Sequence, residues 1–198
     1  MARIGIIIGS TRPGRKAEVV ARWLLEVARK RGDAEYELVD IAEYNLPHLD
    51  EPMPPSMGQY SKPHTKAWAA KIDSLDGFVF VTPEYNHSTS GALKNAIDFL
   101  YREWNNKAAG FVSYGSAGGA RAVEHLRLVM AELQVATVRA QVMFSLANDF
   151  ENYLVFKEPA PGSHHEKAAN VMLGQVVGWS TALHSVRKIP QASGAAGR

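Results

Sequence analysis

The sequence contains no cysteine among its 198 residues, and it has neither clusters of one charge sign nor long hydrophobic runs. Without cysteine, the chain has no disulfide, thiolate nucleophile, Cys-ligated zinc or iron–sulfur cluster, so any redox chemistry must come from a bound cofactor. The formal net charge is +2 and basic residues are interspersed with acidic ones, which disfavours a nucleic-acid partner. Because no run reaches membrane-spanning length and no signal-peptide pattern opens the chain, we expect a cytoplasmic protein without a membrane partner.

The length suits one α/β domain, which we place at residues 1–188, followed by a small, polar, Gly-rich tail at 189–198 that we expect to be disordered. Apolar runs rich in β-branched residues predict strands at 3–8, 35–40, 77–82, 109–113 and 137–142. Apolar residues at three- and four-residue steps predict helices at 16–31, 64–74, 90–103, 120–133 and 165–187. Strand alternating with helix predicts a parallel sheet with helices on both faces.

Two segments are predicted to be irregular. Residues 41–63 contain five prolines (Pro47, Pro52, Pro54, Pro55 and Pro63), so this segment is neither an ordinary helix nor a central strand. It is either a functional or interface segment, or a surface excursion, and the sequence leaves both open. Residues 148–163 form the second irregular segment and contain no motif that indicates a function.

Three predicted strands end in loops of small and polar residues, at 9–15, 83–86 and 113–119. Ligands of open α/β sheets bind at the carboxyl ends of the strands, so these loops are expected to form one pocket. The strand order 3-2-1-4-5-6 separates the first and third strands, whereas the order 2-1-3-4-5 makes the first, third and fourth strands neighbours. We therefore predict a flavodoxin-like, doubly wound, five-stranded parallel sheet of order 2-1-3-4-5.

The first loop has the composition of an anion site, because hydroxyls, backbone N–H groups at a helix N-terminus and two arginines, Arg12 and Arg15, favour a phosphate. It is not a P-loop, since Arg15 and Lys16 stand where Lys followed by Ser or Thr is required. It is not the G-x-G-x-x-G dinucleotide fingerprint either. Without that fingerprint, Asp40 at the end of the second strand is expected to be a surface residue rather than a ribose ligand.

The second and third loops suit a planar ligand. Pro83, Tyr85 and Asn86 offer a fixed φ, an aromatic face and a side-chain amide, although a Pro-initiated turn with a core-packed tyrosine explains the same residues. Gly115 and its neighbouring glycines permit close backbone approach to a ligand. The sequence has no G-x-S-x-G nucleophile elbow, which disfavours a serine hydrolase. It also has no H-E-x-x-H spacing, so we expect no metal site.

Together the segments Gly-Ser-Thr-Arg-Pro-Gly-Arg at 9–15, Pro-Glu-Tyr-Asn-His-Ser at 83–88, Gly-Ala-Leu-Lys-Asn-Ala-Ile-Asp at 91–98 and Ser-Tyr-Gly-Ser-Ala-Gly-Gly at 113–119 resemble the NAD(P)H-dependent FMN reductase family. The resemblance implies non-covalent FMN, electrons from NAD(P)H, a small-molecule acceptor such as a quinone, azo compound or free flavin, and a homodimer or a dimer of dimers. The flavin would carry the chemistry, so no catalytic side chain is expected.

The resemblance also implies which residues bind FMN. The phosphate would be bound by Ser10, Arg12, Arg15, Lys16 and Ala17. The isoalloxazine would contact Pro83, Glu84, Tyr85 and Asn86, and Ser113 and Gly115 would flank the ring. Two alternatives stay open from the sequence: a flavodoxin-type electron carrier, and a nucleotide-binding Rossmann protein without flavin.

Overall fold

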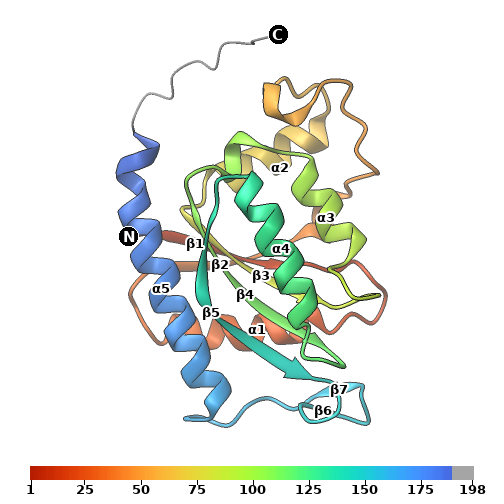
Figure 1. Ribbon diagram of the computed structural model, residues 1–198, viewed down its shortest axis with the longest axis vertical. Coiled ribbons are helices and arrows are strands. Elements are labelled where there is room, and N and C mark those ends of the chain that lie inside the picture. The colour runs from red at the N-terminus through yellow and green to blue at the C-terminus, as the bar shows by residue number, and fades with distance from the viewer. Residues whose placement is uncertain (189–198) are drawn as a thin grey trace.

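In the computed structural model, which describes residues 1–188, five parallel strands form one sheet in the order β2-β1-β3-β4-β5 (Figure 1). The strands are β1 (Arg3–Ile8), β2 (Glu35–Asp40), β3 (Gly77–Pro83), β4 (Ala108–Gly115) and β5 (Ala136–Ser145). The three central strands are almost entirely buried, as expected for apolar strands covered on both faces. The predicted flavodoxin-like fold and strand order are confirmed.

Helices cover both faces of this sheet (Figure 1). On one face lie α1 (Ala17–Arg29) and α5 (His164–Arg187), which share a hydrophobic core with the alternate side chains of β1, β3, β4 and β5. On the other face lie α2 (Pro63–Asp73), α3 (Gly91–Asp98) and α4 (Ala120–Glu132), packed over a second core rich in aromatic residues. Each helix buries apolar side chains against the sheet, although Ala67, expected to face inward in α2, is exposed.

The helix predicted at 90–103 is shorter than expected. It ends at Asp98, and a separate 3-10 turn, η3 (Arg102–Trp104), follows. Two buried indoles compete for the last carbonyls of this helix: Trp68 Nε1 donates to the Ala96 carbonyl at 2.7 Å and Trp104 Nε1 to the Ile97 carbonyl at 3.2 Å. Because a buried indole N–H requires an acceptor, tertiary packing sets this boundary instead of helical periodicity.

The strands at the predicted pocket are longer than expected. The ladder continues through Pro83 in β3 and through Tyr114 and Gly115 in β4, where Pro83 pairs with Tyr114 and Gly115 pairs with Ser145. Three residues predicted to lie in loops, Pro83, Tyr114 and Gly115, are therefore strand residues, and Ser113, predicted both to end the strand and to begin the loop, lies within β4. The free part of the second loop begins at Glu84, and that of the third loop begins at Ser116.

The two irregular segments contain short elements. Residues 41–63 include the 3-10 turns η1 (Ile41–Tyr44) and η2 (Pro55–Met57), and residues 148–163 include a small antiparallel hairpin of β6 (Phe150–Glu151) and β7 (Val155–Phe156). Among the described residues, no helix is long and apolar enough to cross a membrane. The tail predicted at 189–198 lies outside the described residues.

Candidate functional site

The fold brings the three predicted loops together at the carboxyl edge of the sheet. The first and second loops are joined because the Gly9 N–H donates to the Val81 carbonyl at 2.9 Å and the hydroxyls of Ser10 and Tyr85 lie 3.3 Å apart. The second loop is joined to β4 through the Glu84 N–H, which donates to the Tyr114 carbonyl at 3.0 Å. Loops that are far apart in sequence therefore form one continuous rim.

The N-terminus of α1 differs from those of the other four α-helices described. A hydroxyl or carboxylate accepts hydrogen bonds at each of the others: Glu51 at α2, Ser90 at α3, Glu84 at α4 and Ser163 at α5. No side chain caps α1, which starts after Lys16. The first amides of this 13-residue helix therefore have no capping side chain, and together with the helix dipole they favour an anion.

A second unsatisfied donor lies beside the same helix end. Tyr114 is 5 % exposed, and its hydroxyl is buried without a hydrogen-bond partner among the described residues. Burial, together with the neighbouring Tyr85, raises the pKa of the Tyr114 phenol, while the backbone N–H of Ala17 and the charges of Arg12 and Arg15 act in the opposite direction. Tyr114 belongs to the core on the α1 side of the sheet, and its hydroxyl stays protonated there and can donate to a ligand.

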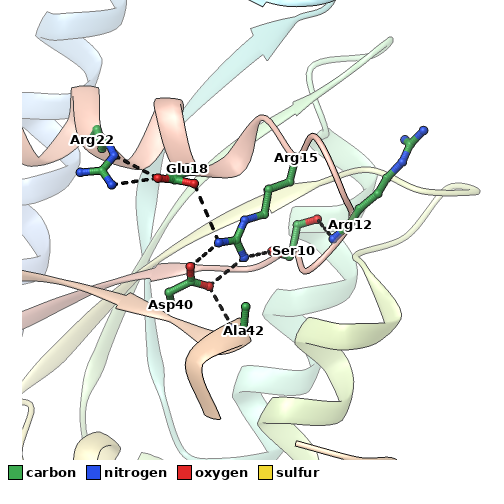
Figure 2. Close-up of polar contacts among 7 residues, drawn as sticks. All are labelled: Ser10, Arg12, Arg15, Glu18, Arg22, Asp40 and Ala42. Atoms are coloured by element: carbon green, nitrogen blue, oxygen red, sulfur yellow. Dashed lines mark hydrogen bonds and ion pairs between the residues drawn. The ribbon is translucent and has the colours of Figure 1, made fainter. Parts of the chain in front are cut away.

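Arg15, one of the two arginines of the first loop, is already paired. Its Nη1 donates to the Ser10 carbonyl at 2.7 Å and to Asp40 Oδ1 at 2.8 Å, and its Nη2 pairs with Asp40 Oδ2 (Figure 2). Asp40 is 15 % exposed in its side chain and also accepts a hydrogen bond from the Ala42 N–H. Asp40 is therefore an anchor of the first loop, and its prediction as a surface residue is wrong.

Arg12 and Lys16 are the other two cations of the first loop. Arg12 is exposed, and its guanidinium lies 5.9 Å from the centre of the Tyr85 ring. Its backbone N–H donates weakly to the Ser10 hydroxyl at 3.4 Å. Lys16 occupies the N-cap position of α1, and Ala17 is the buried first residue of the helix. Arg12 and Lys16 thus lie at the uncapped helix end.

The second loop is a tight two-residue turn. Tyr85 and Ser88 exchange backbone hydrogen bonds of 2.9 and 3.1 Å, and the two residues between them, Asn86 and His87, both have positive φ (47° and 74°). This is the geometry of a type I′ turn. The Tyr85 N–H is used inside the turn, so the amides available to a ligand are those of Asn86 and His87.

Glu84 is bound within the protein. Its side chain is 4 % exposed, forms an ion pair with Arg121, and accepts hydrogen bonds from the backbone N–H groups of Arg121 at 3.1 Å and Ala122 at 3.4 Å. Burial alone would raise the pKa of Glu84, but these hydrogen bonds outweigh it and hold the pKa below its usual value. Glu84 therefore ties the second loop to the N-terminus of α4.

The third loop is held against β4 by a hydrogen bond from a buried strand residue. Ser113 is fully buried and its hydroxyl donates to the Gly118 carbonyl at 2.7 Å. Gly119 has a φ of 76°, and a Cβ there would lie 2.6 Å from the Cβ of Ser113, so only glycine fits. At Gly115 a Cβ would meet the Cβ of Glu84 at 3.1 Å, so the end of β4 lies close against the second loop.

All the residues predicted to bind the ligand thus come from the three joined loops or the strand ends beneath them, but their side chains differ in availability. Arg12, Lys16, Tyr85 and Asn86 remain open to a ligand, whereas Ser10, Arg15, Glu84 and Ser113 are largely used inside the protein. A nearby hollow of about 340 Å³ is lined by residues of η1 and α3 and touches the first loop only at Thr11. Among the described residues, no three His, Asp or Glu side chains gather to hold a metal ion.

Two contributors were missed from the sequence. Asp40 was dismissed for want of a dinucleotide fingerprint, although an acid at the carboxyl end of a strand beside an arginine-rich loop was a usable signal. Tyr114 was counted as a loop residue. Its spacing of two from the buried Val112 placed it on the same face of β4, toward α1.

The fold is that of a flavodoxin-like protein, and the uncapped N-terminus of α1 is a candidate anion site after its first strand. Residues 2–149 match the family model described as NADPH-dependent FMN reductase, and the chain belongs to this family. It is therefore an oxidoreductase with FMN as its cofactor and NAD(P)H as its electron donor.

Named relatives agree with this assignment. An NAD(P)H-dependent FMN reductase of a Nectria species is 42 % identical over 159 residues, covering 75 % of this chain and 79 % of the relative. One of Schizosaccharomyces pombe is 40 % identical over 149 residues, covering 74 % of each chain. Among solved structures, the flavoenzyme NAD(P)H:(acceptor) oxidoreductase FerB of Paracoccus denitrificans superposes with a TM-score of 0.67 at 21 % identity, over 93 % of this chain and 98 % of that one, which supports the fold.

The residues present fit FMN. A phosphate needs an anion site, and the uncapped end of α1 with Arg12 and Lys16 would supply one. The orphaned Tyr114 hydroxyl beneath it needs an acceptor, which a phosphate or ribityl oxygen would provide. The amides of Asn86 and His87, which have no backbone hydrogen-bond partner among the described residues, are donors suited to the polar edge of a flat heterocycle.

Proposed function

We propose that this protein transfers a hydride from NAD(P)H, by way of FMN, to a quinone, an azo compound, a free flavin or a similar small acceptor. The observation that carries the proposal is the uncapped N-terminus of α1 beside the buried, unpartnered Tyr114 hydroxyl, at the carboxyl ends of three adjacent strands. A quinone reductase of Escherichia coli, 36 % identical over 135 residues, supports the quinone among these acceptors.

FMN, when bound, supplies a redox centre that accepts two electrons from a nicotinamide and passes them on. The protein residues bind and orient it. The amides of the first loop, Arg12 and Lys16 would hold the phosphate, and the Tyr85 ring and the amide of Asn86 would contact the ring system. Donors at this turn stabilise negative charge on the ring electrostatically. Ser113 and Gly115 shape the wall beside it.

Three further expectations belong to this proposal. Residues 1–188 act as a single domain, the assembly is a homodimer or a dimer of dimers, and the protein works in the cytoplasm. The family assignment disfavours the flavodoxin-type carrier, as does the net charge of +2, because such carriers are strongly acidic. It likewise disfavours a nucleotide-binding protein without flavin.

The test is a visible spectrum of purified protein after reconstitution with FMN, followed by anaerobic titration with NADPH and with NADH. We expect flavin absorbance that is bleached by one equivalent of nicotinamide and restored by one equivalent of benzoquinone. Steady-state turnover with each donor and a quinone then measures the catalytic cycle. Bound flavin that is bleached only when a separate reductase is added would contradict the proposal and support the electron carrier.

A further inference from the structure

We propose that Arg15 is a positioning residue that holds the first loop in shape, and that Arg12, Lys16 and the amides of α1 meet the charge of the FMN phosphate. This inference rests on the proposed placement of the phosphate at α1. It differs from the role that the family resemblance implied, in which Arg15 binds the phosphate directly.

The contacts of Arg15 leave little of its guanidinium for a ligand. Both donor nitrogens at the end of the side chain bind Asp40, and Nη1 also binds the Ser10 carbonyl at 2.7 Å. Glu18 Oε2 lies 3.9 Å from Nη2. The side chain is 16 % exposed. Arg15 therefore faces β2 and η1, and is surrounded by acceptors of the protein itself.

If Arg15 bound a phosphate instead, Asp40 would lose its ion-pair partner. The Asp40 carboxylate is 15 % exposed and keeps only the Ala42 N–H, at 2.9 Å, if the guanidinium leaves. A poorly hydrated carboxylate without a counter-charge is costly, so the pair is favoured over an exchange of partners. The pair is close to neutral as a unit and adds little to the attraction of an anion.

The bridge fixes the loop that must receive the phosphate. Arg15 joins the Ser10 carbonyl, at the end of β1, to Asp40 at the end of β2, and Asp40 caps η1. Figure 2 shows these contacts in one cluster, with Arg12 pointing away from it. Holding the loop in its binding conformation before the ligand arrives lowers the cost of binding. The Ser10 hydroxyl also lies 3.3 Å from that of Tyr85 in the second loop, where the ring of FMN or riboflavin is proposed to bind, so the benefit extends to a flavin with or without a phosphate.

Arg12 and Lys16, unlike Arg15, are not paired with an acidic side chain among the described residues. Among the described residues, neither forms an ion pair, and Arg12 is exposed beside Tyr85 at the rim of the site. Both are attached to the segment that ends in the uncapped helix. A free cation at a helix N-terminus adds charge-assisted hydrogen bonds to a phosphate.

The experiment compares the dissociation constants of FMN and riboflavin for the apoprotein, measured by flavin fluorescence quenching. Riboflavin lacks the phosphate, so the ratio of the two constants isolates the phosphate contacts. For Arg12→Gln we expect FMN affinity to fall by about tenfold or more while riboflavin affinity is unchanged. For Arg15→Gln and for Asp40→Asn we expect both affinities to fall by the same factor, which leaves the ratio unchanged within about twofold.

Further variants keep the result interpretable. Arg15→Lys retains a charge but loses the planar fork, so it should behave as Arg15→Gln does. The double variant Arg15→Gln/Asp40→Asn removes both charges. Its loss of affinity for each flavin should be smaller than the product of the fold-losses of the two single variants. Arg22→Gln, which removes an exposed partner of Glu18 next to the cluster, is the matched control and should change neither affinity. Circular dichroism of each apoprotein identifies variants that fail to fold.

Three outcomes would overturn the inference. They are a loss of FMN affinity alone in Arg15→Gln, a gain of FMN affinity in Asp40→Asn, and full restoration by Arg15→Lys. Each is expected if Arg15 is a direct phosphate ligand. Failure of the wild-type protein to prefer FMN over riboflavin would instead contradict the proposed phosphate site itself.

Discussion

Replacing Tyr114 by phenylalanine tests the site most directly, because the change removes one oxygen atom and little else. That hydroxyl is buried and unpartnered among the described residues, and Tyr114 lies at the carboxyl end of β4 on the α1 side of the sheet, where the phosphate is proposed to bind. The variant is therefore expected to have opposite effects on the apoprotein and on cofactor binding.

The magnitudes follow from the state of this hydroxyl. Burying an unsatisfied hydroxyl costs about 1–3 kcal/mol, so its removal should stabilise the apoprotein by about 1 kcal/mol after relaxation. For a chain of this size, that gain raises Tm by about 2–4 °C. A hydrogen bond to a charged acceptor contributes about 1.5–3 kcal/mol, so FMN affinity should fall by about tenfold to a hundredfold.

The assay pairs thermal unfolding of the apoprotein, followed by circular dichroism, with a fluorescence titration of FMN. Tyr60→Phe is the matched control, because the Tyr60 hydroxyl donates to Glu103 at 2.8 Å, far from the three loops. The control should lose stability, by about 1 kcal/mol, and bind FMN as the wild type does. A less stable Tyr114→Phe apoprotein with unchanged FMN affinity would refute the reasoning, since the hydroxyl would then have a partner within the protein.

Three further predictions concern stability. Glu84→Gln should lower the free energy of unfolding in urea by about 1–2 kcal/mol at pH 7. The folded pKa of Glu84 lies below the unfolded value of 4.5, so this difference should be constant above pH 4.5 and should disappear as the pH falls through the folded pKa. Burial lowers the pKa of the Lys107 ammonium to about 8 from 10.5, so between pH 8 and 10.5 the unfolded chain binds more protons than the folded protein. The free energy of unfolding of the wild type should therefore rise across this pH range, by up to about 3 kcal/mol relative to Lys107→Met. Gly119→Ala should lower the free energy of unfolding by about 2–4 kcal/mol, because the new Cβ would lie 2.6 Å from the Cβ of Ser113 at a residue with positive φ. The matched variant Gly178→Ala has open space around the new Cβ and should not destabilise the protein. Equal Tm values for these two variants would contradict the geometry.

Much of the fold could be read from local patterns. The apolar run at residues 3–8 and the helical stripe at 16–31 encode their own conformations, so their boundaries differ from the structure by no more than two residues. The boundary at Asp98 could not be read in this way, because it depends on indoles that arrive from elsewhere in the chain. The hairpin of β6 and β7 was also missed, since each strand has only two residues and no periodicity to detect.

The candidate site divides in the same way. The residue types that suit a phosphate and a flat ring are visible in the sequence, as are the three loops that carry them. The partners of those residues are not visible: Arg15 is separated from Asp40 by 25 residues, and Glu84 from Arg121 by 37. Which side chains remain free for a ligand depends on these long-range pairs.

The sequence by itself determined which segments form strands and helices, the order of the strands, and the family, because these depend on local periodicity and on short motifs. The tertiary structure decided which charges are neutralised inside the protein, which helix end stays uncapped, and which buried hydroxyl lacks an acceptor. The physical reason is that hydrogen bonds and ion pairs depend on distances between atoms, and residues far apart in the chain come within bonding distance only in the folded state.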